Sequence, residues 1–176
     1  GRGGQGAWTA SELLAKAAVL EGKYIQSFPE FGPERMGAPM VAYTRISDEP
    51  IKLHCSIYNP NVVVVLDPTL LKTVKVTHGL TEDGILVINT QESHTELKKK
   101  MDIAFRKVWT VPATDIAIKV LNVPITNTSM LGAATRAASL VNLDSIEMVI
   151  KERFHPALAE RNIAVIREAY KEAKMG

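Results

Sequence analysis

Apolar residues recur at helical spacing directly after a glycine-rich start. Five small or apolar residues follow one another at i, i+3, i+4, i+7 and i+8: Ala10, Leu13, Leu14, Ala17 and Ala18. This spacing places them on one face of a helix. We predict a helix from Ala7 to Leu20 that is ended by Gly22, because glycine suits the left-handed position after a helix.

Short apolar runs later in the chain predict buried strands. Val62–Leu66 and Gly84–Asn89 are continuous apolar runs without polar alternation. Such runs are typical of strands that helices cover on both faces, and hence of parallel sheets. Lys107–Val111 predicts a further short strand.

Alternating residues predict a different kind of strand in the first third of the chain. Met40–Ile46 alternates in this way, and Ser47–Pro50 has the composition of a turn. Lys23–Phe28, directly after Gly22, predicts a short strand before them. Ile51–Ile57 follows the turn and predicts a second strand. We therefore expect an antiparallel hairpin over Met40–Ile57 at one edge of the main sheet.

Helical patterns dominate the second half of the chain. The predicted helices are Pro112–Leu121, Asn127–Val141, Asp144–Phe154 and Pro156–Met175. Ser93–Ala104 is compatible with a helix but is less regular. Asp144 and Glu147 form a capping-box variant, with Asp in place of Ser or Thr. Gly132 and the alanines around it allow another backbone or subunit to approach closely.

Strands that alternate with helices predict an α/β fold. We expect one domain over residues 1–176, with a three-layer, Rossmann-like architecture. It has a mostly parallel central sheet, an antiparallel edge hairpin and a helical C-terminal part. Because glycine loops of this kind usually follow a strand, we also expect a first strand before residue 1.

Composition excludes several classes of protein. The chain has 176 residues, a net charge of +2 and no basic run longer than Lys98–Lys100. This charge is too small for a nucleic-acid binder. No apolar run reaches the roughly 18 residues of a membrane span. The single cysteine, Cys55, excludes an internal disulfide and a self-contained iron–sulfur cluster, and it fits a reducing cytoplasm.

The glycine-rich start, Gly1-Arg2-Gly3-Gly4-Gln5-Gly6, is the main candidate for binding. A glycine loop that leads into a helix can cradle an anion, because free N–H groups and the helix dipole point the same way. Gly1, Gly3 and Gly6 match the dinucleotide spacing G-x-G-x-x-G. No acidic residue follows at the end of the next strand to hold a ribose. A tight turn without a ligand, or contact with another ligand or subunit, therefore stays open.

Other candidate residues form no complete active site. The four histidines lie far apart in sequence, and nothing near Cys55 would activate its thiol. The adjacent charges Glu34 and Arg35 lie in a loop rich in proline and glycine. They could clamp a polar ligand or a partner, or they could form a solvated turn.

Four segments together resemble one family. These are Gly1–Gly6 with its alanine-rich helix, Phe28–Pro39 (FPEFGPERMGAP), Thr44–Ile46 and Asn127–Ala133 (NTSMLGA). In combination they resemble the gamma subunit of 2-oxoacid:ferredoxin oxidoreductases. The form of the loop within Phe28–Pro39 is similar to the pyruvate and branched-chain 2-oxoacid branch. Pyruvate and 2-oxoisovalerate stay open as substrates, as do a stand-alone nucleotide-binding protein and a purely structural subunit.

The resemblance implies a multi-subunit enzyme. Such an enzyme decarboxylates a 2-oxoacid on thiamine diphosphate with magnesium, reduces ferredoxin through clusters of the 4Fe–4S type, and transfers the acyl group to coenzyme A. The resemblance places the thiamine and the clusters on the alpha, beta and delta subunits. We expect this chain alone to hold no cofactor and to be inactive.

The resemblance also implies that this chain helps to form the coenzyme A site and a subunit interface. The expected binding residues are Arg2, Gly3, Gly4, Gln5, Gly6, Glu34 and Arg35. No catalytic or metal-binding residue is expected.

Overall fold

The computed structural model describes residues 1–30, 36–101 and 107–176. Its main sheet has the order β3-β4-β5-β6, in which β3 (Val62–Val65), β4 (Ile85–Asn89) and β5 (Lys107–Val111) are parallel. The short β6 (Lys174–Met175) pairs antiparallel with β5. The strands predicted at Val62–Leu66, Gly84–Asn89 and Lys107–Val111 are confirmed, and the first two pair in parallel as expected.

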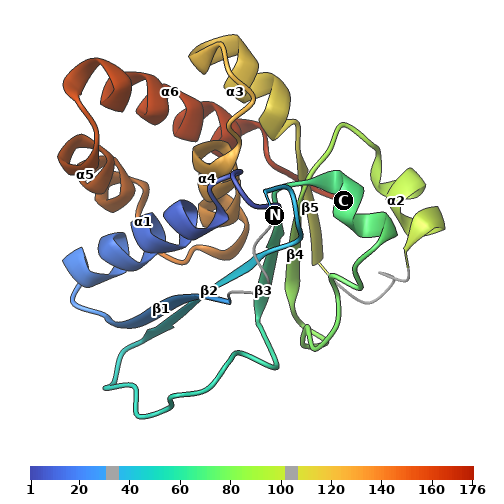
Figure 1. Ribbon diagram of the computed structural model, residues 1–176, viewed down its shortest axis with the longest axis horizontal. Coiled ribbons are helices and arrows are strands. Elements are labelled where there is room, and N and C mark those ends of the chain that lie inside the picture. The colour runs from blue at the N-terminus through green and yellow to red at the C-terminus, as the bar shows by residue number, and fades with distance from the viewer. Residues whose placement is uncertain (31–35, 102–106) are drawn as a thin grey trace.

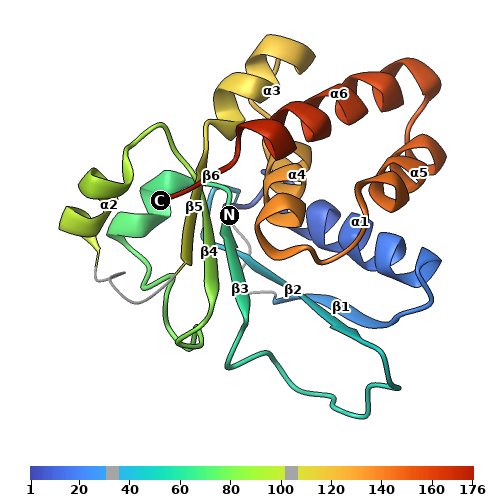
Figure 2. The same ribbon diagram turned by 180° about the vertical axis from the view of Figure 1, so that it is seen from behind.

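Helices cover both faces of this sheet, so the expected three-layer architecture is confirmed. In Figures 1 and 2, α4 (Asn127–Ala138) and α6 (Pro156–Glu172) lie on one side of the sheet. The 3₁₀ helix η1 (Pro68–Lys72) and α2 (His94–Lys100) lie on the other side. Alternate β4 residues enter two different core clusters, Val87 with the α4–α6 layer and Leu86 with the α2 layer. Burial on both faces explains why β4 is apolar without alternation.

A second, two-stranded sheet packs on the first helix. α1 (Ala7–Leu20) lies across β1 (Tyr24–Glu30) and β2 (Val41–Ser47), which pair antiparallel. Apolar residues of α1, β1 and β2 form one cluster with α5 (Leu143–Arg153) and α6. The bounds of α1 match the prediction.

The predicted hairpin over Met40–Ile57 is wrong in its second strand. Residues 51–57 form no strand, and β2 pairs with β1 in a separate sheet, not at the edge of the main one. Side chains of the sheet hold residues 51–57 through two carbonyl groups, since Gln26 donates to Leu53 (2.7 Å) and Arg45 donates to Cys55 (3.2 Å). These bonds replace the backbone ladder of a strand.

Three smaller predictions about the C-terminal half need correction. α5 begins after Asn142, and Glu147 binds Arg167 through two hydrogen bonds instead of completing a capping box. α6 ends at Glu172 because the following residues form β6 on the edge of the main sheet. α4 ends at Ala138, where Ser139 is left-handed.

The close approach predicted for Gly132 is confirmed within the chain. A Cβ atom added at Gly132 would overlap the carbonyl oxygen of Ile166 on α6. α3 (Ala113–Leu121) completes this helical layer. Among the described helices, none is long and apolar enough to cross a bilayer.

Candidate functional site

The glycine loop lies at the carboxyl end of β3, beside the start of η1. Its first residues pair with the segment that precedes β2: Gly3 donates to Ala38 (2.9 Å) and Met40 donates to Gly1 (2.9 Å). Gly4 and Gly6 have φ angles of 91° and 77°, a region that favours glycine. The loop therefore turns twice before α1 begins at Ala7.

Asp67 holds the two large side chains of this loop. One carboxylate oxygen accepts from Arg2 Nε (3.1 Å) and Gln5 Nε2 (2.7 Å). The other accepts from the backbone and hydroxyl of Thr69 (2.9 and 2.6 Å). The backbone of Arg2 also donates to Gln5 Oε1 (2.7 Å). The glycine loop and the end of β3 are thereby tied into one unit.

The carboxylate of Asp67 stays ionised in this network. Burial by itself would raise the pKa of Asp67. Hydrogen bonds from Thr69 and Gln5, together with the charge of Arg2, outweigh burial, so the pKa lies below its ordinary value. The ion pair between Asp67 and Arg2 persists at neutral pH for this reason.

The guanidinium of Arg2 is anchored but not saturated. Its Nε donates to Asp67 and Thr69, and its Nη2 donates to Thr69. Its Nη1 donates to the Gly37 carbonyl (3.0 Å). Of its five N–H bonds, one on each terminal nitrogen has no partner among the described residues. The side chain is 29% exposed. Arg2 can therefore still offer two donors to an anion, in a fixed orientation.

The first turn of α1 adds further donors. The amide groups of Ala7, Trp8 and Thr9 begin the helix and have no intrahelical acceptor. The positive end of the helix dipole lies at the same place. The start of α4 also lies there, since a Cβ on Gly6 would stand 2.6 Å from Asn127 Nδ2. Two helix N-termini therefore meet at the glycine loop.

Of the expected binding residues, the structure brings Arg2, Gly3, Gly4, Gln5 and Gly6 together. The Gly3 amide donates to the Ala38 carbonyl, and the Gln5 side chain donates to Asp67. These two residues therefore stabilise the conformation of the loop. Glu34 and Arg35 lie outside the described residues.

The sequence prediction missed Asp67, Thr69 and the contact of Asn127 with the glycine loop. Asp67 and Thr69 follow a predicted parallel strand, where functional side chains of α/β folds often lie. That position was a usable signal. Asn127 opens a predicted helix but shows no sign in sequence of its contact with Gly6.

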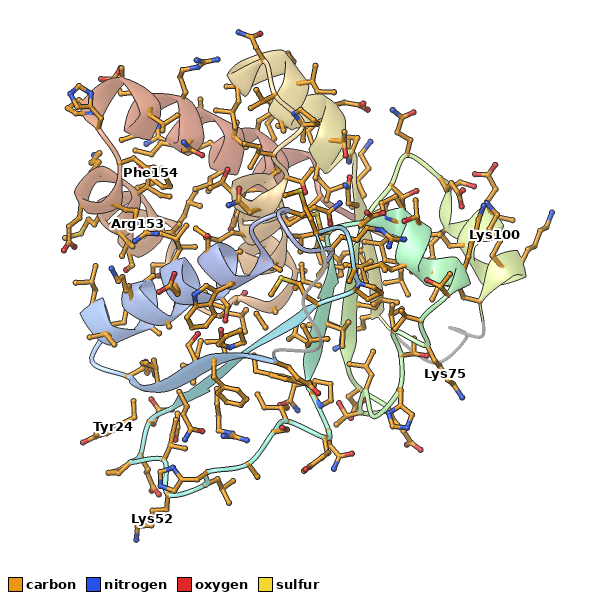
Figure 3. All side chains as sticks on the ribbon, viewed as in Figure 1. Tyr24, Lys52, Lys75, Lys100, Arg153 and Phe154 are labelled. Carbon is orange, nitrogen blue, oxygen red and sulfur yellow. The ribbon has the colours of Figure 1, made fainter. Side chains whose placement is uncertain are left out.

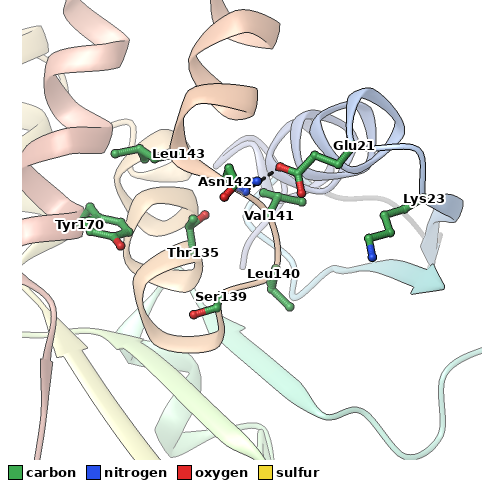
Figure 4. A pocket seen from close by; sticks show the side chains of 9 residues that line it. All are labelled: Glu21, Lys23, Thr135, Ser139, Leu140, Val141, Asn142, Leu143 and Tyr170. Atoms are coloured by element: carbon green, nitrogen blue, oxygen red, sulfur yellow. Dashed lines mark hydrogen bonds between the residues drawn. The ribbon is translucent and has the colours of Figure 1, made fainter. Parts of the chain in front are cut away.

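Two cavities lie away from the loop. The first, of about 320 Å³, lies where α1 and α4 end and α5 begins (Figure 4). At this cavity, the Glu21 carboxylate accepts a hydrogen bond from the backbone of Asn142, the N-cap residue of α5 (2.6 Å). The second, of about 450 Å³, lies between the η1–β4 loop and the end of α2, beside Lys75 and Lys100 (Figure 3). Lys100 is paired there with Glu92 (2.5 Å).

Burial would raise the pKa of Glu21, but hydrogen bonds from Ser145 and Asn142 lower it overall. The ionised Glu21 at the edge of the first cavity thus binds the N-cap residue of α5, Asn142. No group of three or more potential metal ligands occurs in the described parts of the chain.

Comparison with known proteins gives consistent matches along nearly the whole chain. Residues 1–172 match the family described as pyruvate ferredoxin/flavodoxin oxidoreductase. The chain is 51% identical to the pyruvate/ketoisovalerate oxidoreductases common subunit gamma of Pyrococcus abyssi, covering 99% of this chain and 95% of that protein. It is 47% identical to pyruvate synthase subunit PorC of Methanocaldococcus jannaschii, covering 98% and 93%.

Solved structures agree with this result. The pyruvate oxidoreductase subunit PORC of Thermotoga maritima has a TM-score of 0.91 at 44% identity, covering 100% of this chain and 94% of that one. A 2-oxoglutarate:ferredoxin oxidoreductase from Magnetococcus marinus has a TM-score of 0.79 at 16% identity. That match covers 97% of this chain and 29% of the other, and it shows the fold alone. The resemblance seen in the sequence is confirmed, and the chain belongs to the pyruvate ferredoxin/flavodoxin oxidoreductase family.

Proposed function

We propose that this chain is the gamma subunit of a complex that converts pyruvate and coenzyme A to acetyl-CoA and CO2 and reduces ferredoxin. Its similarity to the gamma and PorC subunits over almost their full length supports this role. 2-Oxoisovalerate is the second candidate substrate, because the Pyrococcus relative is named as common to both oxidoreductases.

The partners in this proposal are the alpha, beta and delta subunits, with ferredoxin as electron acceptor of the complex. The chain has one cysteine, which by itself cannot supply the four thiolates that hold a 4Fe–4S cluster. Clusters, thiamine diphosphate and magnesium would therefore be held by the other subunits. Purification of the complex from its source, followed by mass identification of the bound chains, tests the partners. Recovery of this chain without any other subunit would contradict them.

Within the complex, the glycine loop binds a phosphate group of coenzyme A. One observation supports this assignment: Arg2 is fixed by Asp67, Thr69 and Gly37, yet one N–H on each terminal nitrogen has no partner among the residues that the structure describes. The N-terminus of α1 reinforces the preference for negative charge. The solved Magnetococcus marinus oxidoreductase is described with coenzyme A and succinyl-CoA bound, which is compatible with such a site in this fold.

A stand-alone dinucleotide-binding protein fits the structure less well. In dinucleotide-binding folds, the strand after the first helix lies parallel to its neighbour in the main sheet and ends in an acidic residue. Here that strand is β1, which is antiparallel to β2 and belongs to a separate sheet. The expectation that no acidic residue ends this strand is wrong, because β1 extends to Glu30, but the Glu30 carboxylate accepts from the Tyr43 hydroxyl (2.6 Å).

Substitution of Arg2 tests the phosphate site. In the assembled complex, Arg2→Ala should raise the KM for coenzyme A roughly 10- to 150-fold, the effect of losing a charged hydrogen bond. The KM for pyruvate should change much less. Arg153→Ala removes the same charge from an exposed position at the end of α5 and serves as the control. Unaltered coenzyme A kinetics with weaker assembly would show that the loop is structural.

A further inference from the structure

The segment Asn127–Ala133 helped to carry the family resemblance, yet the Arg2 network gives it no role. Its small residues explain part of the pattern, because Gly132 lets α4 approach α6 closely. That packing does not explain Asn127, which lies in the first turn of α4, against the glycine loop. Asn127 needs a separate reason.

Asn127 is a buried residue whose side-chain carbonyl is hydrogen-bonded and whose side-chain NH2 group is not bonded to any described residue. Its residue is 8% exposed, in the first turn of α4. The carbonyl Oδ1 accepts from the backbone of Thr128 (2.9 Å), which fixes the direction of the amide plane. The Nδ2 group carries two hydrogens and has no hydrogen-bond partner among the described residues.

The Asn127 amide packs directly against Gly6. A Cβ on Gly6 would lie 2.6 Å from Nδ2 and 3.0 Å from Cγ of Asn127, so Nδ2 lies beside the N-cap of α1. The amides of the first turn of α1 begin at the next residue. Ser129 Oγ is the one fully buried side-chain nitrogen or oxygen atom without a partner among the described residues, so Nδ2 of Asn127 keeps contact with solvent. A donor that solvent reaches beside a helix N-terminus is also open to an anionic ligand.

We propose that Asn127 is a ligand-binding residue of the glycine-loop site and donates through Nδ2 to the same anionic group that Arg2 and α1 bind. The ligand class is a phosphate monoester or diester. This role rests on the proposed function, because coenzyme A is the phosphate-bearing substrate of that function. It also explains why two helix N-termini meet at one loop, since both dipoles favour the same negative charge.

Asn127→Asp separates binding from folding. The substitution keeps an oxygen for the Thr128 amide and places a negative charge at the start of α4, where it is favourable. Folding of the chain should therefore be preserved. The same substitution removes the Nδ2 donor and sets a carboxylate against the anion. Calorimetric titration of the assembled complex with coenzyme A, without 2-oxoacid, should show roughly 10- to 100-fold weaker binding.

Two further variants secure the comparison. Asn59→Asp adds the same charge at an exposed position outside the loop and should leave coenzyme A binding unchanged. Asn127→Ala removes the donor without adding charge, so it should weaken binding by a smaller factor. Circular dichroism and thermal unfolding of each variant establish that the fold is retained.

The outcomes distinguish the two proposals. Weaker binding in both Arg2→Ala and Asn127→Asp supports both. If Arg2→Ala weakens coenzyme A binding and the two Asn127 variants do not, Asn127 binds only water and its proposed role is wrong. If none of the variants changes binding, the phosphate site itself is wrong.

Discussion

Gly6 and Asn127 fit together with no room for a side chain on Gly6. A Cβ at Gly6 would lie 2.6 Å from Nδ2, 3.0 Å from Cγ and 3.1 Å from Cβ of Asn127, and the φ angle of Gly6 is 77°. Gly4 has a similarly positive φ of 91°, but a Cβ there would meet nothing within 4 Å. A side chain at Gly4 would therefore meet backbone strain alone, whereas a side chain at Gly6 would meet backbone strain and steric overlap.

Gly6→Ala should destabilise the chain more than Gly4→Ala. The left-handed conformation costs an alanine about 1–2 kcal/mol in either position. Overlap with Asn127 should add about 1–3 kcal/mol at Gly6 only. Urea unfolding measures both, and the double variant Gly6→Ala/Asn127→Ala should recover part of the added loss. Equal losses for the two glycine variants would contradict the contact.

Asp67 should contribute to stability at neutral pH and lose that contribution in acid. Its pKa in the folded chain lies below the ordinary value of about 4. The stabilisation is therefore present above about pH 4 and is lost as the pH falls through the lower folded pKa. Asp67→Asn leaves the donors of Arg2 and Gln5 facing an amide, which should cost about 2–3 kcal/mol at pH 7.

Unfolding titrations between pH 7 and pH 2 test this directly. The difference in stability between the wild-type chain and Asp67→Asn should shrink at the acid end. Asp83→Asn, at an exposed residue before β4, is the matched control and should show no such convergence. A constant difference at all pH values would show that Asp67 acts by shape and not by charge.

Gly132→Ala tests the packing of α4 on α6. Alanine favours a helix over glycine by about 1 kcal/mol. The new methyl group would overlap the backbone carbonyl of Ile166, which cannot move aside as a side chain can. Overlap of this kind costs about 1–3 kcal/mol. We expect a net loss of stability in thermal unfolding, and a higher Tm would mean that α6 yields readily.

Local patterns in the sequence predicted those helices and strands whose buried residues recur at the regular spacing of the element. α1 is bounded by glycines and has one apolar face, and β4 is apolar on both faces, so neighbouring residues alone defined them. Residues 51–57 failed because strand propensity does not supply a partner, and β1 was already paired with β2. β6 is two residues long and forms only by pairing with β5, so no pattern of its own could predict it.

The candidate site was half predictable for a related reason. The glycines and Arg2 are contiguous, so their spacing alone indicated an anion site. Asp67 lies 65 residues from Arg2, and the residue that meets Gly6 lies on α4. Such pairs depend on how the strands and helices are arranged, which no local pattern encodes.

Outside the site, the aromatic face of β1 and β2 offers a spectroscopic check. The rings of Phe28 and Tyr43 lie 5.2 Å apart, and the Tyr43 hydroxyl donates to Glu30 (2.6 Å). Burial and the bond to Glu30 raise the pKa of Tyr43 to about 12. Ultraviolet titration should show one tyrosine that ionises late, and Tyr43→Phe should abolish that step. Loss of a different step would contradict the assignment.

Arg2→Lys distinguishes the shape of the guanidinium from its charge. Lysine keeps the positive charge but has three donors on one nitrogen. Arg2 reaches Asp67, Thr69 and Gly37, and two of its N–H bonds have no partner within residues 1–30, 36–101 and 107–176. An ammonium group that stays on Asp67 cannot also present a fork to a phosphate. We expect Arg2→Lys to raise the KM for coenzyme A about 10-fold, close to the lower end expected for Arg2→Ala. The KM for pyruvate should stay nearly constant, as should assembly measured by gel filtration. If Arg2→Lys has wild-type affinity for coenzyme A, charge alone suffices, and the anchoring of Arg2 by Asp67 serves the fold rather than the ligand.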